Sequence, residues 1–269
     1  MGMIKMTFKR KKHNALIIDT ETTMKNEKPF LAYHIGGCIG DIYSQDSKPL
    51  EFDFYVQEII ANPKNFEHTY IDKETGERKF WKYDSRYVKV LEDAFKNRSK
   101  IKPLRYVMNY LEKQIGFADS MASYNWAFDK QALKKTNLEH FNEDWKGSEN
   151  VPNFCLMDCY ANSMINHTYF KMVDNLEPIY KANFLSHSGK NYGYSAQCMA
   201  RWIFENPDYT EQHTALDDSK MEFELARHFA RKHKKQFEDT FLGNPKTVSW
   251  TLLKKKLSAK AKMEKREQG

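Results

Sequence analysis

Residues 14–23 of the 269-residue chain read NALIIDTETT, and they place two acidic side chains at the end of a short apolar run. Residues 15–20 begin with four apolar side chains rather than an alternating pattern, which predicts a strand buried on both faces. Because side chains alternate along a strand, Asp19 and Glu21 emerge on the same face and can hold one cation together. The same D-x-E spacing recurs at residues 72–74 in a charged loop, so the first pair is informative only because it follows a buried strand. Ionisable groups there need a compensating charge.

A second carboxylate stands at the start of an expected helix. Residues 124–129 read YNWAFD and follow a short strand-like segment. Asn125 suits the N-cap position of a helix over about residues 126–136, so Asp129 would end the first helical turn. Apolar side chains three and four residues later share the face of Asp129 and direct it toward a sheet. Taken alone, Asp129 is also explained as an acid that complements the helix dipole.

The third acidic element is the stretch HTALDD at residues 213–218. Thr214 and Asp217 have the T-x-x-D spacing of a capping arrangement, which predicts a helix that begins at Thr214. Asp217 would then cap the helix, whereas Asp218 would face the core. His213 would lie on the loop just outside the helix, where its ring can move.

These elements together provide four carboxylates and one histidine, each at the junction of a strand or helix with a loop. Such a set suits a pair of divalent cations, Mg²⁺ or Mn²⁺, that clamp the attacking and leaving oxygens of a phosphodiester. His213 would deprotonate the attacking water, because the unperturbed pKa of a histidine lies near working pH.

The rest of the sequence predicts an α/β fold. Two strand-like runs, residues 31–42 and 50–56, follow the first strand and suggest an antiparallel meander. Helices and short strands then alternate in the order α, β, α, β, α, α. The later strands are expected over residues 121–124 and 154–157, and the helices over about residues 84–98, 103–116, 126–136, 195–205 and 214–234.

The chain is expected to form one domain over residues 1–245, followed by a tail. Residues 57–102 begin with a turn-rich and charged stretch, which favours an insertion into this domain. Residues 246–269 carry eight basic and two acidic side chains, and we expect them to be a basic tail that is helical or disordered.

The charge of the chain favours a polyanionic partner. Lys and Arg number 43 against 36 Asp and Glu, which gives a formal net charge of +7. The excess is concentrated in residues 9–12, in residues 231–235 and in the basic tail. Such clusters attract nucleic acids, although a solvated surface accounts for them equally well.

Composition favours a cytoplasmic protein. With 41% hydrophobic residues the chain can fill a sizeable core, and no apolar run is long enough to cross a bilayer. The first residues contain no apolar segment of the secretory type. Four scattered cysteines are too few for a disulfide framework and favour free thiols in a reducing cytoplasm over a zinc site. We therefore expect a cytoplasmic location and no membrane partner.

Three motifs stand in an order that resembles a known group of nucleases. They are IIDTETT at residues 17–23, YNWAFD at 124–129 and HTALDD at 213–218. Together they resemble the exonuclease motifs of the DEDDh superfamily, which includes proofreading exonuclease subunits, oligoribonuclease and RNase T. The resemblance covers most of residues 14–232 and implies an RNase H-like, mixed five-stranded sheet flanked by helices.

The resemblance also implies roles for particular residues. It implies four metal-site carboxylates and a general base, namely Asp19, Glu21, Asp129, Asp218 and His213. It implies a backbone segment that meets the terminal nucleotide, at Thr20, Thr22 and Thr23, and two residues near the bound strand, Asn125 and Phe128.

The favoured function is a metal-dependent 3′–5′ exonuclease that uses two divalent cations and a histidine base to release nucleoside monophosphates from single-stranded ends. One alternative is a non-catalytic nucleic-acid-binding module on the same fold, and another is an RNase H-like endonuclease or integrase. The five intact motif residues favour the exonuclease. The sequence leaves open whether the substrate is DNA or RNA, whether the chain forms a homodimer, and whether a polymerase or other replication partner exists.

Overall fold

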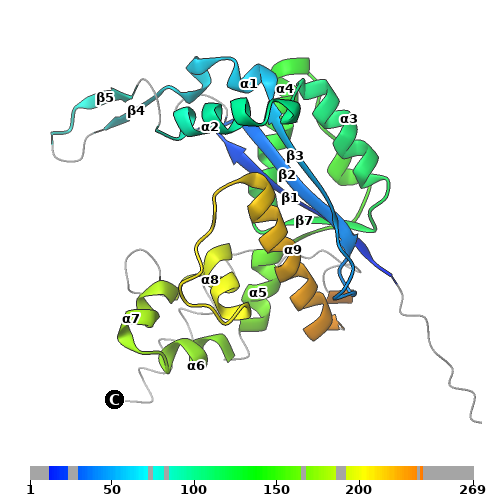
Figure 1. Ribbon diagram of the computed structural model, residues 1–269, viewed down its shortest axis with the longest axis vertical. Helices are drawn as coiled ribbons and strands as arrows, with labels where there is room; N and C mark the ends of the chain where they lie inside the picture. Colours follow the sequence, from blue (N-terminus) through cyan, green and yellow to red (C-terminus); the bar gives the residue numbers. More distant parts are fainter. Residues whose placement is uncertain are drawn as a thin grey trace, which may run out of the picture.

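The computed structural model describes residues 12–23, 30–71, 75–81, 85–164, 168–185, 192–234 and 237–238. Its centre is a six-stranded sheet with the strand order β6-β3-β2-β1-β7-β8 (Figure 1). The strands are β1 (Asn14–Thr22), β2 (Ala32–Asp41), β3 (Leu50–Val56), β6 (Ile101–Lys102), β7 (Ser120–Ser123) and β8 (Asn153–Cys155). The first three form an antiparallel meander, whereas β7 and β8 run parallel to β1, and β6 runs parallel to β3.

The α/β class and the mixed sheet expected from the sequence are confirmed, with one more strand than expected. The additional strand, β6, has only two residues and pairs with the end of β3. A two-residue strand is too short to show an alternation of polar and apolar side chains. The pairing of β6 therefore depends on contacts with the rest of the folded chain.

Strand β1 separates two hydrophobic cores. The core on one face contains Leu16 and Ile18. The core on the opposite face contains Ala15 and Ile17, and all four side chains are fully buried. The prediction of a strand buried on both faces is therefore confirmed, and it explains why β1 is apolar without alternation.

Helices cover both faces of the sheet (Figure 1). One core packs against α3 (Leu104–Ile115) and α4 (Trp126–Phe141). The other packs against α5 (Leu156–Met164), α8 (Ala196–Ile203) and α9 (Ala215–Lys232). Each predicted helix is present within a few residues of its expected bounds, except that α4 continues to Phe141.

Helix α9 begins where the sequence predicts, directly after its N-cap Thr214. The Thr214 hydroxyl oxygen accepts a hydrogen bond from the backbone N–H of Asp217 over 3.2 Å. The first turn lies directly on β2 at Gly36, where a Cβ atom would clash with the backbone of Ala215 and Leu216. A glycine at this position therefore lets the start of α9 approach the sheet closely.

Residues 57–102 extend from the end of β3 to β6. They contain α1 (Gln57–Ile60), η1 (Pro63–Phe66), β4 (His68–Ile71), β5 (Arg78–Trp81), α2 (Ser85–Lys96) and η2 (Arg98–Lys100). Strands β4 and β5 pair with each other in a separate two-stranded sheet that projects from the body (Figure 1). Helix α2 returns the chain to the central sheet.

The chain between α4 and α8 contains further short elements: η3 (Gly147–Glu149), α6 (Thr168–Asp174), α7 (Pro178–Lys181) and η4 (Ala182–Phe184). The four cysteines are buried and form no disulfide. Within the described ranges, the helices are too short or too polar to cross a membrane. The expected basic tail, residues 246–269, lies outside the described residues.

Candidate active site

Three carboxylates from two elements meet at one end of the sheet. Asp19 and Glu21 lie near the end of β1, and Asp218 lies in the first turn of α9. One oxygen of each carboxylate lies within 4.8 Å of the corresponding oxygens of the other two. The structure thus brings together acidic residues from two motifs that are almost two hundred positions apart in the sequence.

Asp129 lies beside these three and is held by hydrogen bonds. Its Oδ1 accepts hydrogen bonds from the backbone N–H of Thr20 over 3.0 Å and from the Thr20 hydroxyl over 2.7 Å. Its Oδ2 accepts a hydrogen bond from the Ser123 hydroxyl over 2.7 Å. The side chain is only 3% exposed. These hydrogen bonds fix Asp129 to β1 and β7.

The carboxylates repel one another. Burial raises the pKa of Asp19 well above its usual value, and the nearby charges of Glu222, Asp129 and Glu21 raise it further. Burial likewise raises the pKa of Asp218 to about 7, with further increases from Glu211 and Glu21. Such shifts arise where several acids share a poorly solvated site.

The three clustered carboxylates can hold a metal ion. Carboxylate oxygens are the ligands that hard divalent cations prefer, and the cluster supplies three of them within a short distance. A divalent cation would also offset the repulsion that raises the pKa of Asp19 and Asp218. The chemistry of the donors therefore fits a cation, with Asp19, Glu21 and Asp218 as the residues that would hold it.

Glu222 is a further site residue that the sequence analysis missed. It lies one helical turn after Asp218 on α9 and is only 3% exposed. Its Oε2 accepts a hydrogen bond from the backbone N–H of Tyr124 over 3.0 Å. Among the neighbouring charges, Glu222 makes the largest contribution to the raised pKa of Asp19. The available signal was its spacing of four residues from Asp218, which places both side chains on the same helix face.

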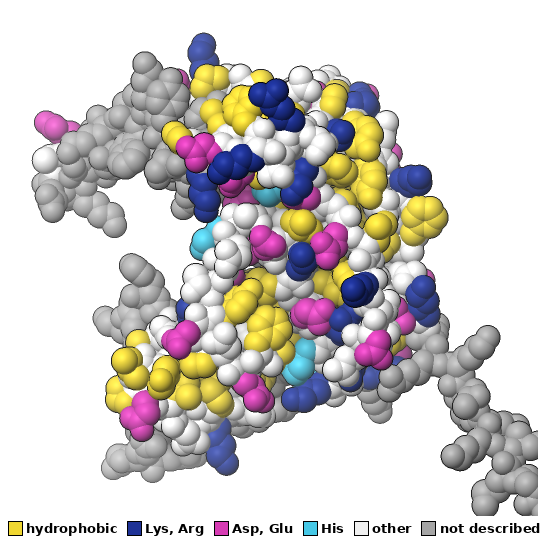
Figure 2. Space-filling model, viewed as in Figure 1, with side chains coloured by type: hydrophobic (Ala, Val, Ile, Leu, Met, Phe, Trp, Pro, Cys, Tyr) yellow, Lys and Arg dark blue, Asp and Glu magenta, His cyan; other side chains and the backbone are white. Residues whose placement is uncertain are grey.

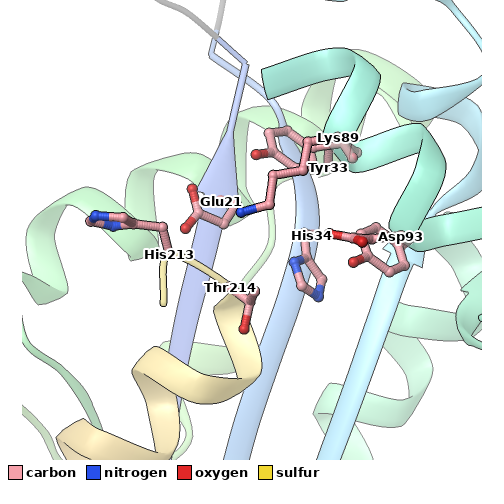
Figure 3. A pocket seen from close by; sticks show the side chains of 9 residues that line it. Glu21, Tyr33, His34, Lys89, Asp93, His213 and Thr214 are labelled. Carbon is pink, nitrogen blue, oxygen red and sulfur yellow. The ribbon is translucent and has the colours of Figure 1, made fainter. Parts of the chain in front are cut away.

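His213 lies on the loop before α9, as predicted, and its backbone is in the left-handed region with a φ of 54°. Its side chain is 69% exposed, and its Nδ1 lies 3.9 Å from Glu211 Oε2. Its backbone N–H forms a hydrogen bond with Asp218 that lowers the pKa of that carboxyl, against the larger effect of burial. Figure 3 shows its ring directed away from the other labelled side chains. A non-glycine residue in this conformation marks a loop that its surroundings constrain.

A pocket of about 420 Å³ adjoins the carboxylates. Its wall comes from β1, β2, β3, α2 and the residues before α9, namely Glu21, Tyr33, His34, Tyr55, Lys89, Val90, Asp93, His213 and Thr214 (Figure 3). The Lys89 side chain extends toward Glu21 in that view. In Figure 2, basic, acidic and histidine side chains are mixed on the surface between α2 and the start of α9. Helix α2, within residues 57–102, therefore supplies one side of the pocket.

The three threonines after Asp19 differ in their surroundings. Thr20 is 5% exposed, and both its N–H and its hydroxyl are bonded to Asp129. Thr23 is 4% exposed, and its hydroxyl accepts a hydrogen bond from the Leu31 backbone N–H over 2.9 Å. Thr22 is only partly buried and follows a shift in the register between β1 and β2. Of the three, Thr22 is the most accessible to a ligand.

Asn125 and Phe128 lie at the start of α4. Asn125 occupies the N-cap position, as predicted, but its exposed side chain makes no capping hydrogen bond. Phe128 is 40% exposed, and its ring stacks on Phe30 with a centroid distance of 5.1 Å and an interplanar angle of 7°. The Lys135 ammonium lies 4.4 Å from the centroid of the Phe30 ring. These contacts hold the Phe128 ring in place next to Asp129.

Several solved structures with a similar fold are exonucleases. A 3′-exonuclease that recognises the 3′ end of the histone mRNA stem-loop superposes with a TM-score of 0.51 at 10% sequence identity, over 86% of this chain and 84% of its own. A product-bound exonuclease I gives a TM-score of 0.53 at 10% identity, over 85% of this chain and 46% of its own. The zinc-bound complex of E. coli exonuclease I with single-stranded DNA gives 0.51 at 11% identity, over 85% and 42%. The chain has an exonuclease fold.

This exonuclease fold agrees with the resemblance of the three motifs to the DEDDh superfamily. The resemblance is thus confirmed at the level of the fold. The chain spans less than half the length of the two exonuclease I chains. No family model and no curated protein matches the sequence.

Proposed function

We propose that the chain is a metal-dependent 3′–5′ exonuclease that releases nucleoside monophosphates from single-stranded nucleic acid. The observation that carries the proposal is the cluster of Asp19, Glu21 and Asp218 beside a pocket that His213 also lines. A cation site and a histidine at the mouth of one pocket are the components required for hydrolysis of a phosphodiester. The exonuclease fold supports the same activity.

The proposed cofactors are two divalent cations, Mg²⁺ or Mn²⁺. Asp19, Glu21 and Asp218 would hold them, and Asp129 would be the fourth carboxylate. Bound cations would stabilise the negative charge that develops on the phosphodiester. A similar exonuclease I has been solved in a zinc-bound form with single-stranded DNA, which supports a bound cation in this chain.

His213 would act as the general base. Its Nδ1 faces Glu211, so its Nε2 is the atom available to take a proton from the attacking water. The exposed ring can turn into the pocket without breaking a packed contact, because 69% of the side chain is exposed. The hydrogen bond between its backbone N–H and Asp218 keeps the loop next to the carboxylates during this turn.

The single strand would lie against α4. Exposed aromatic rings bind single-stranded nucleic acid by stacking on its bases. The Phe128 ring offers such a surface, already oriented by Phe30. Asn125, exposed at the N-cap, and Thr22, at the end of β1, would contact the same strand. The Thr20 N–H already donates a hydrogen bond to Asp129. The backbone contact with the terminal nucleotide would therefore come from the Thr20 carbonyl or from Thr22.

The terminal nucleotide would enter the pocket beside Glu21. A volume of about 420 Å³ is within the range of small-ligand sites. The Lys89 ammonium, on the side formed by α2, would attract the phosphate of this nucleotide.

The test measures nucleotide release from oligonucleotides labelled at the 5′ end. We expect shortening from the 3′ end with release of mononucleotides in Mg²⁺ or Mn²⁺, and no release in EDTA. Asp19→Asn should abolish release, because the site loses one ligand charge. Binding of the strand without any release, in either metal, would favour the non-catalytic module instead. Cleavage of a circular single strand would indicate an endonuclease.

The same assay distinguishes the two nucleic acids. Among the proteins with a similar fold, one recognises an mRNA stem-loop and another binds single-stranded DNA. Equal lengths of single-stranded DNA and RNA should therefore be compared in one reaction, because contacts with the 2′-hydroxyl decide between them.

A further inference from the structure

A second set of polar side chains connects η2, β3 and β2 with the start of α9. Lys100 Nζ lies 2.6 Å from Asp53 Oδ2, and Asp53 Oδ1 lies 2.5 Å from His34 Nε2. On the other side of the imidazole ring, His34 Nδ1 lies 3.4 Å from the backbone nitrogen of Ala215. These contacts connect the end of the 57–102 insertion, through β3 and β2, to the start of α9.

The hydrogen-bond pattern fixes the orientation of the His34 ring. The Ala215 N–H can only donate, so His34 Nδ1 must accept, and Nε2 must carry the proton that it donates to Asp53. The ring also stacks on Tyr55, with a centroid distance of 4.1 Å and an interplanar angle of 14°. The side chain is 4% exposed, so the ring is held by its two hydrogen bonds and by the stack on Tyr55.

The far end of this set lies at the residues that the proposed mechanism uses. Ala215 is the first residue of α9, two positions after His213 and three before Asp218. The first N–H groups of a helix have no partner within the helix. Thr214 accepts from one of them and His34 from another, while Gly36 allows the same turn to rest on β2. Strand β2 therefore fixes both the distance between the start of α9 and the sheet and the rotation of α9 about its own axis.

We propose that His34, oriented by Asp53 and Lys100, is a positioning residue that fixes the start of α9 and thereby places His213 and Asp218. The inference rests on the proposed function in one respect, because it takes His213 as the base and Asp218 as a metal ligand. It also gives the insertion a second role. Through Lys100, the segment that walls the pocket is connected to the loop that carries His213.

The test replaces His34 by two amides of different length. In His34→Asn, the amide oxygen can take the place of Nδ1 and accept from Ala215, but the contact with Asp53 is lost. In His34→Gln, the amide reaches the place of Nε2 and donates to Asp53, but the Ala215 N–H loses its acceptor. Both variants remove the same ring from the stack on Tyr55, so they serve as controls for each other in packing.

We expect His34→Gln to lower kcat on a single-stranded oligonucleotide by about 10–100-fold, with little change in KM, as for other residues that orient a metal site. His34→Asn should lower kcat clearly less than His34→Gln does, although both variants should lose similar amounts of thermal stability. Equal losses of kcat in the two variants, in proportion to the loss of stability, would mean that His34 only fills space, and would overturn the inference.

A second measurement does not depend on nuclease activity. The backbone N–H of Ala215 should exchange with solvent faster in His34→Gln than in His34→Asn or the wild type. Unchanged exchange in His34→Gln would overturn the inference even if the chain is a nuclease. A wild-type chain without nuclease activity would instead refute the proposed function, and the exchange measurement would still decide the role of His34.

Two lysines provide variants that leave the core intact. Lys100→Met removes the contact with Asp53, and we expect it to lower kcat several-fold. Lys102, two residues later, faces the Tyr106 ring with its Nζ 5.4 Å from the ring centroid, so Lys102→Met should leave kcat unchanged. If the two lysine variants have the same kcat, Lys100 does not act through Asp53 and the connection to the insertion is refuted.

Discussion

The carboxylate of Glu222 accepts a hydrogen bond from the backbone N–H of Tyr124 over 3.0 Å, and this bond joins α9 to the junction between β7 and α4. Helix α9 carries Asp218 and α4 carries Asp129, and both carboxylates belong to the candidate site. The bond therefore helps to set the separation between these two carboxylates. It also places one more negative charge near Asp19, so Glu222 stabilises the geometry of the site while it increases the repulsion within it.

Glu222→Gln should separate these two effects. The amide oxygen can still accept from Tyr124, while the charge that raises the pKa of Asp19 is removed. We expect the metal-free protein at about pH 8 to have a higher free energy of unfolding than the wild type, because one source of repulsion at Asp19 is gone. Its affinity for Mn²⁺ should fall. Denaturant unfolding in EDTA and calorimetric titration with Mn²⁺ measure the two quantities.

The control for this variant is Glu222→Met, which removes the charge and the acceptor together. It leaves the Tyr124 N–H without its partner, so it should be less stable than Glu222→Gln by about 1–3 kcal/mol. A Glu222→Gln protein that is less stable than the wild type in EDTA would show that other groups of the protein already compensate the charge of Glu222.

The stability of the metal-free protein should decrease as the pH rises. Burial raises the pKa of Asp218 to about 7 from the usual 3.8, and Asp19 and Glu222 shift in the same direction. Between those values the folded state holds a proton that the unfolded state has lost, so the free energy of unfolding falls from about pH 4 to about pH 7. Melting curves in EDTA should show this fall. Added Mn²⁺ should raise Tm more at the upper end of the pH range, because the carboxylates must be deprotonated to bind it. Asp218→Asn should flatten the dependence; a Tm in EDTA that rises over this range would contradict the assignment.

Much of the fold follows from local patterns in the sequence. The buried strand β1, the meander and the start of α9 each have a signal within a few residues, because apolar runs and capping residues act locally. Strand β6 and the short helices between α5 and α8 have no such signal, since each is too short to show a period. Their conformation depends on contacts with distant parts of the chain.

The candidate site was predictable where its residues stand at the ends of strands and helices, as Asp19 and Asp218 do. Glu222 was missed because a glutamate in a helix is usually exposed, and only the close approach of Tyr124 makes it a buried acceptor. The contact of His34 with Asp53 depends on the register between β2 and β3, in which His34 faces Tyr55. A register of this kind is set by the whole sheet and not by either strand alone.

Phe128 should contribute to strand binding more than to the fold. Stacking of one base on an aromatic ring contributes about 1–3 kcal/mol, so Phe128→Ala should weaken binding of a single-stranded oligonucleotide by about 5–150-fold. Fluorescence anisotropy in Ca²⁺ measures this binding in the absence of turnover. Phe117 offers the matched control, since it is 61% exposed and stands two residues before Asp119, which is hydrogen-bonded to the opposite end of β1 at Asn14. Equal effects of Phe117→Ala and Phe128→Ala would contradict a specific stacking site.

The basic tail should add affinity without adding chemistry. Deletion of residues 246–269 removes eight basic and two acidic side chains. If they contact phosphates, the slope of log Kd against log salt should become shallower, while kcat on short oligonucleotides is retained. An unchanged slope after the deletion would show that the tail does not contact the strand.

His213 and Asp218 should respond differently to substitution, although both belong to one motif. Asp218→Asn removes a charged ligand, so Mn²⁺ affinity and activity should fall together. His213→Asn leaves the four carboxylates in place and tolerates the left-handed backbone at this position, so Mn²⁺ binding and Tm should be retained. Its activity should fall by about 10²–10⁴-fold, the usual contribution of a general base. A His213→Asn protein with the turnover of the wild type would show that the histidine only precedes a helix.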